Sequence, residues 1–154
     1  MKQHKPRSTT ASNPGAGKTA TAHPLAEEVR PGQSVELLKE LHILTREGKL
    51  NQDSRRKLKQ VYHLYQFIEK LLMSLGDGAT VADHGAGKSY LGFILYDLFF
   101  RDRPDGWIYG IETRPELVQK SQALAQRLGF ARMTFLPMSV AEATGSSALP
   151  QRID

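Results

Sequence analysis

A glycine-rich turn lies between two acidic residues that are suited to bind a ligand. Asp83 precedes the turn, which holds Gly85, Ala86 and Gly87, and Glu112 ends a later apolar segment. The glycines permit backbone torsions closed to other residues and let the backbone approach a ligand closely. A helix that starts after such a turn presents free N–H groups and a partial positive charge. These residue types in this order predict a ligand-binding turn flanked by carboxylates.

The elements that would position these residues alternate between strand and helix from about residue 79 onward. Such an order implies an α/β fold, a Rossmann-like parallel sheet of about three strands with right-handed crossovers. Asp83 and Glu112 then both lie at the carboxyl ends of strands, where open α/β sheets bind ligands. A capping box, Thr113 to Glu116, is expected to open the second helix of this unit. The predicted strands and helices, in chain order, are 80–83, 89–100, 107–112, 113–129, 133–136 and 139–142.

The same residues carry a resemblance to a known family. Asp83–Gly87 resembles the D/E-x-G-x-G first motif of class I S-adenosylmethionine-dependent methyltransferases, and Ile108–Glu112 resembles the strand that follows it. The order Gly-Ala-Gly-Lys-Ser-Tyr-Leu at 85–91 is especially similar to an uncharacterised branch of that superfamily, related to some RNA methyltransferases. The resemblance covers about residues 79–154.

The resemblance implies S-adenosyl-L-methionine as cofactor and a role for each residue of the turn. Glu112 would accept hydrogen bonds from the ribose hydroxyls, and Asp83 would lie near the methionine ammonium. The loop of Gly85, Ala86 and Gly87 would pass beneath the methionine part and the ribose. The resemblance assigns no catalytic residue within the chain.

Three segments are expected along the chain. Residues 1–33 are rich in proline and small polar residues and lack large apolar side chains, so we expect a disordered basic tail. Residues 34–76 are expected to form a helical segment, with helices from Ser34 to Gly48 and over 53–75. Residues 77–154 would then form the cofactor-binding domain.

The charge pattern favours an anionic partner. The net charge is +5, and four basic residues crowd the start of the second helix, where positive charge is unfavourable. An anionic partner such as RNA, bound through this cluster and the basic tail, would offset that cost. A solvated basic face is the alternative interpretation. The cluster consists of Arg55, Arg56, Lys57 and Lys59.

The composition limits the other classes of protein and site. The sequence has no cysteine, which removes disulfides, thiolate zinc sites and cysteine nucleophiles. No apolar stretch reaches the roughly 18 residues needed to cross a bilayer, and no apolar segment follows the basic N-terminus as in a secretory signal. We therefore expect a cytoplasmic protein without membrane contact. The five histidines are scattered, so no metal site is predicted.

Three other functions fit parts of the sequence. Ala82, Gly87, Lys88 and Ser89 satisfy a loose P-loop pattern, but the Asp83 carboxylate would face a polyphosphate of like charge. One such pair at about 4 Å costs about 4 kcal/mol at an effective dielectric constant near 20. An NAD-binding turn would need a third glycine where Tyr90 stands. A binding module without catalysis, which uses the basic segments on RNA or protein, is the third alternative.

The last residues bear on where catalysis would occur. A fourth strand is expected to begin near Ile153 and Asp154, so the chain is expected to be part of a longer protein. Methyltransferases of the class that the sequence resembles usually position the acceptor with residues after that strand. The catalytic residues are therefore expected after Asp154.

Overall fold

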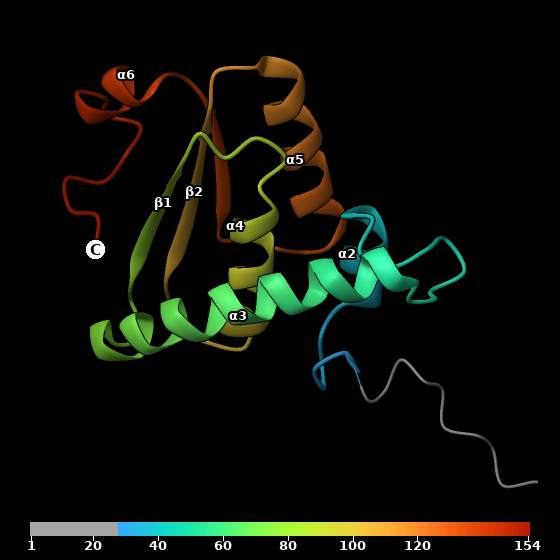
Figure 1. Cartoon of the computed structure of the whole chain (residues 1–154). Helices are drawn as coiled ribbons and strands as arrows, with labels where there is room; N and C mark the ends of the chain where they lie inside the picture. Colours follow the sequence, from blue (N-terminus) through green and yellow to red (C-terminus); the bar gives the residue numbers. More distant parts are fainter. Residues whose placement is uncertain (1–27) are drawn as a thin grey trace, which may run out of the picture.

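The computed structural model describes residues 28–154 and contains a small parallel sheet with helices packed against it (Figure 1). Residues 1–27 of the disordered tail predicted over 1–33 lie outside the described residues. No helix within residues 28–154 is long and apolar enough to cross a membrane. In chain order the elements are α2 (Val35–Glu40), α3 (Gln52–Leu75), β1 (Thr80–His84), α4 (Tyr90–Leu95), the π-helix η1 (Tyr96–Phe100), β2 (Trp107–Glu112), α5 (Pro115–Arg127), β3 (Met133–Pro137) and α6 (Val140–Thr144).

The sheet has three parallel strands in the order β1-β2-β3. Asp83 pairs with Gly110 across β1 and β2, and Glu112 pairs with Pro137 across β2 and β3. The predicted α/β fold with about three parallel strands is therefore confirmed. Because all three strands run in the same direction, the carboxyl ends of β1 and β2, which carry Asp83 and Glu112, lie at the same end of the sheet.

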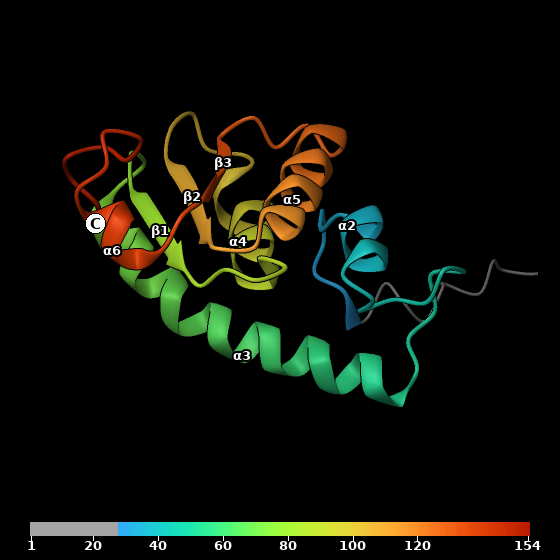
Figure 2. The same ribbon diagram turned by 90° about the horizontal axis from the view of Figure 1, so that it is seen from above.

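The helices form a second layer that fixes the turn after β1. The aromatic rings of Phe93 in α4 and Phe135 in β3 lie 5.6 Å apart between their centres. α5 contacts β2 and β3, and α3 packs on α4. Figure 2 shows α3 as a long helix that runs past α4 and ends next to β1. Side chains from α2, α3, α4 and the strands share one buried core, which includes Leu37, Tyr65, Phe93 and Ile108. The predicted burial of the 89–100 segment is confirmed.

That segment is not one regular α-helix. Residues Tyr90–Leu95 form α4, and Tyr96–Phe100 continue as a π-helix in which the Arg101 amide donates to the Tyr96 carbonyl at 2.8 Å. The wider turn contains Asp97, whose side chain is buried. Its carboxylate accepts the Ser34 amide at 2.9 Å and pairs with Arg101 at 2.6 Å. The π-helix therefore ties the start of α2 to the helical layer.

The first predicted helix is shorter than its apolar spacing suggests. α2 ends at Glu40 instead of continuing to Gly48, because His42 adopts a left-handed backbone conformation with φ of 53°. The amides of Ile43 and Leu44 both donate to the Leu38 carbonyl, so a tight turn, not a helix, buries these apolar side chains. The second predicted helix, 53–75, is confirmed as α3.

The prediction of disorder is wrong for residues 28–33. The Arg30 guanidinium lies 5.0 Å from the ring centre of Tyr62 and 4.8 Å from that of Tyr65. The side chain of Gln33 is buried and accepts a hydrogen bond from the Tyr62 hydroxyl. Aromatic rings of α3 thus supply partners that the composition of this segment alone does not reveal.

Replacement of Asp97 tests how firmly the N-terminal segment is attached. Asp97→Ala removes the acceptor of the Ser34 amide and the partner of Arg101. Hydrogen bonds to charged groups contribute about 1.5–3 kcal/mol, so we expect a loss of about that size in the free energy of unfolding, measured in urea. The exposed Asp102 is the control, and Asp102→Ala should change stability by less than about 0.5 kcal/mol. Equal effects of the two substitutions would contradict this attachment.

Candidate functional site

The turn between β1 and α4 has an alternating left-handed backbone. The φ angles of Gly85, Gly87 and Ser89 are 71°, 59° and 53°. The Ala86 amide donates to the Ile111 carbonyl at 2.9 Å, and the Ser89 amide donates to the Ala86 carbonyl at 2.7 Å. Glycine meets no steric penalty in this region, which explains its presence at two of the three positions. The turn is thereby fastened across the end of β2.

Glu112, the last residue of β2, holds the same turn through its carboxylate. Its side chain is almost completely buried, and its carboxylate accepts the Gly87 amide at 2.8 Å. It also accepts the Arg114 amide at 3.0 Å and the Arg114 guanidinium at 2.9 and 3.2 Å. The Arg114 side chain, then its amide and the Gly87 amide, lower the pKa of Glu112 from its ordinary value of 4.5 to about 2. The group is therefore a carboxylate at neutral pH.

Arg114 covers the carboxylate that sequence reasoning assigned to ligand binding. The predicted capping box at Thr113–Glu116 is wrong, because Arg114 is the N-cap residue of α5 and its side chain makes no capping bond. The Thr113 hydroxyl instead donates to Glu112 at 3.3 Å. The Arg114 side chain is 59% exposed, so it can rotate into solvent. A ligand hydroxyl that reaches Glu112 must share the carboxylate with Arg114 or displace it.

Asp83 lies at the other end of the turn, below the start of α4. Its side chain is half-buried, and burial raises its pKa while the nearby His84 lowers it. A Cβ atom at Gly92 would stand 3.6 Å from the Asp83 carboxylate, an ordinary contact distance, so α4 starts close to this side chain. Side chains alternate along a strand. Because Asp83 pairs with Gly110, two residues before Glu112, both carboxylates leave the same face of the sheet.

Ser89 is a site residue that the sequence analysis missed. Its side chain is fully buried, and its Oγ has no hydrogen-bond partner within residues 28–154. A Cβ atom at Gly92 would lie 2.6 Å from this oxygen and 3.6 Å from the Asp83 carboxylate, so the hydroxyl and Asp83 flank the same glycine. Ser89 continues the spacing of Gly85 and Gly87 by two residues. That regular spacing was the available signal for a third residue in a left-handed conformation.

A cavity of about 760 Å³ opens beside the carboxyl end of β1. Its lining includes His84 and residues of the segment from Ala143 to Ile153. The predicted site residues Asp83, Gly85 and Glu112 do not line this cavity. Within residues 28–154, no cluster of three or more acidic or histidine side chains could hold a metal ion.

Two comparisons with known proteins bear on this site. Residues 56–154 match the model of a protein family described as "Methyltransferase domain". The matched region includes most of α3, the three strands and the glycine turn. The curated proteins compared with the chain gave no match.

The low pKa of Glu112 predicts a particular dependence of stability on pH. The ionised carboxylate stabilises the folded state fully above its ordinary pKa of 4.5, and this contribution is lost as the pH falls toward 2. Glu112→Gln should therefore have a lower Tm than the wild type above about pH 4.5. The difference should shrink between pH 4.5 and 2, as followed by circular dichroism. Curves that stay parallel through this window would contradict the assigned role.

The left-handed backbone at Ser89 predicts that glycine at this position would stabilise the fold. A left-handed conformation costs a residue with a Cβ about 1–2 kcal/mol, and glycine avoids this cost. Ser89→Gly should therefore raise the free energy of unfolding by about 1 kcal/mol after the larger chain entropy of glycine is subtracted. Ser89→Ala removes the hydroxyl but keeps the Cβ and is the matched comparison. A Ser89→Gly variant no more stable than Ser89→Ala would show that the backbone is not strained.

Proposed function

The chain belongs to this methyltransferase-domain family, and from that premise we propose that it binds S-adenosylmethionine at the turn between β1 and α4. Its fold is that of a class I methyltransferase-like domain, and methyl transfer is the chemistry of the family. The observation that carries the proposal is the placement of two carboxylates, Asp83 and Glu112, on one face of the sheet at the two ends of the turn.

The groups around the turn fit the polar parts of this cofactor. Glu112 is ionised and has the acceptor capacity that a pair of ribose hydroxyls requires, once Arg114 moves. Asp83 is half-buried, and burial raises its pKa. A ligand ammonium group beside it would stabilise the ionised carboxylate. The Ser89 hydroxyl beside Asp83 is buried and unpartnered, which is costly for the fold and marks this turn as unusual.

The cofactor supplies an electrophilic methyl group when it is bound. The residues of this chain bind and orient it, and none of them needs to donate or accept a proton in that role. Proximity and orientation are the main sources of rate enhancement for a transfer of this kind. The rigid turn contributes to orientation because the Gly87 amide is held by Glu112 and the Ala86 amide by Ile111.

We propose RNA as the class of methyl acceptor, ahead of protein and small molecules. The support is the net charge of +5 and the basic start of α3. Part of that cluster is neutralised, because Arg55 pairs with Glu28 at 2.8 Å and Lys57 pairs with Asp53 at 2.9 Å. The other two cations of the cluster, Arg56 and Lys59, are exposed and available to phosphates.

Calorimetric titration with S-adenosylmethionine tests the cofactor proposal. Glu112→Ala should weaken binding roughly ten- to hundredfold, because it removes a charged acceptor of ligand hydroxyls. Asp83→Asn should also weaken binding, since it removes the partner of the ammonium while it keeps the shape of the side chain. Glu116→Ala, an exposed acid in the first turn of α5, is the matched control and should leave the affinity unchanged.

Two results would contradict the cofactor proposal. One is an affinity that is the same in Glu112→Ala and the wild type, with both proteins folded by circular dichroism. The other is tight binding of ATP without binding of S-adenosylmethionine, which would favour a nucleotide-binding loop of the P-loop kind instead.

A further inference from the structure

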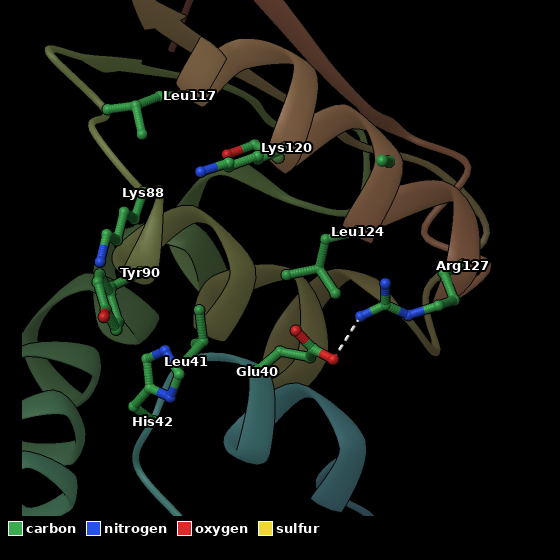
Figure 3. Close-up of a pocket in the computed structure, with 11 residues that line it drawn as sticks. Glu40, Leu41, His42, Lys88, Tyr90, Leu117, Lys120, Leu124 and Arg127 are labelled. Atoms are coloured by element: carbon green, nitrogen blue, oxygen red, sulfur yellow. Dashed lines mark ion pairs between the residues drawn. The ribbon is translucent and has the colours of Figure 1, made fainter.

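A second cavity lies among the helices, and Glu112 is not part of its lining. Its volume is about 380 Å³, and it lies between the end of α2, the start of α4 and one face of α5 (Figure 3). A neighbouring hollow of about 590 Å³ extends from α2 to the start of α3 and shares Glu40 and His42 with it. The two hollows lie next to each other, and we call them together the α2–α5 groove.

The lining of this groove is rich in cations with little acid to balance them. Lys88, in the turn before α4, and Lys120, on α5, both line the first hollow. Lys39 and Arg46 line the second. None of these four cations has an ion-pair partner within the described part of the chain. The acid in the lining is Glu40, which pairs with Arg127 at 2.6 Å, as the dashed line in Figure 3 marks. The net field of the groove is therefore positive.

An apolar floor accompanies the cations. Leu41, Leu117 and Leu124 form part of the lining, and the ring of Tyr90 lies beside Lys88 in Figure 3. Tyr90 is 36% exposed, which leaves part of its ring open to a ligand. An aromatic face next to cations is the combination on which single-stranded nucleic acids bind, since bases stack on the ring while phosphates meet the charges.

The groove also lies beside the basic start of α3. Asn51 and Ser54, the first residues of that region, line the second hollow. Lys57 on the same helix pairs with Asp53 at 2.9 Å. The second hollow therefore reaches the first turn of α3, where the basic cluster begins.

We propose that the α2–α5 groove binds single-stranded RNA, with phosphates at Lys88 and Lys120 and a base on Tyr90. This inference rests on the proposed class of methyl acceptor and adds the surface that holds it. The aromatic ring and apolar floor favour RNA over an acidic peptide, because a peptide carboxylate would use the cations but gain nothing from a stacking surface. Lys120 on α5 and Lys88 after the turn would hold the strand near the end of the sheet that carries the cofactor residues.

Fluorescence anisotropy with a labelled ten-nucleotide single-stranded RNA tests this proposal. The charge-removing variant is Lys88→Gln with Lys120→Gln. The matched control is Lys70→Gln with Arg152→Gln, which removes the same charge from exposed positions outside the groove. Lys70 lies about 24 Å along α3 from Ser54, at 1.5 Å per residue. Each lost phosphate contact should reduce the slope of log affinity against log salt by about 0.7.

The groove variant should therefore bind about 20-fold more weakly than the wild type at 0.1 M salt, with a slope smaller by about 1.4. The control pair should lose less than about threefold. Tyr90→Leu, which keeps the apolar volume, should weaken binding without changing the slope. Equal losses in the groove and control variants would overturn the proposal, because binding would then depend on net charge alone. Equally tight binding of a ten-residue polyglutamate would overturn it in favour of a protein partner.

Failure of this inference is separable from failure of the proposed cofactor. Titration of the wild-type chain with S-adenosylmethionine reports on the turn between β1 and α4. If the cofactor binds while the groove variant retains full RNA affinity, only the groove proposal is wrong. If RNA binds through the groove and the cofactor does not bind, the groove proposal stands and the assigned cofactor is wrong.

Discussion

The hydrogen bond from the Gly87 amide to the Glu112 carboxylate is the constraint on which the site depends. It joins the turn after β1 to the end of β2 at 2.8 Å, and the Ala86 amide adds a second tie to the same strand at 2.9 Å. A buried carboxylate that accepts several N–H groups stays ionised at neutral pH. The same group therefore shapes the turn and, in the proposed function, would provide the acceptor for ligand hydroxyls. Arg114 satisfies that acceptor in the structure, and a ligand would have to take its place.

The helical layer holds this turn in position and accounts for its strain. Gly92 lets α4 start close to Ser89, and the core around Phe93 fixes the helix against the sheet. Ser89 keeps a left-handed backbone and an unpartnered buried hydroxyl, which are both unfavourable for folding alone. Features of this kind persist where surrounding packing enforces them, and they concentrate at functional sites. The stability of the core thus offsets this local cost.

The sequence predicted the three strands, α3 and α5 well. Apolar segments mark the strands, Gly76 follows the end of α3, and Gly129 follows the end of α5. It did not predict the early end of α2, since the turn at His42 buries the same leucines that a longer helix would bury. The attachment of residues 28–34 depends on tertiary contacts with Tyr62 and Asp97, which local composition does not encode. Glu112 and the glycines followed from motif spacing, whereas the covering role of Arg114 and the burial of Ser89 required side-chain positions. The contacts of the site residues with a cofactor stay predictions.

The most direct measurement of the central claim is the response of backbone amides to S-adenosylmethionine in ¹H–¹⁵N correlation spectra. If the two carboxylates and the turn between them bind the cofactor, the amides of Gly85, Gly87 and Ser89 should shift together and saturate with one dissociation constant. The amide of Arg114 should follow the same curve as its side chain leaves Glu112. Shifts confined to other surfaces, with the amides of the turn unchanged at saturation, would contradict the account.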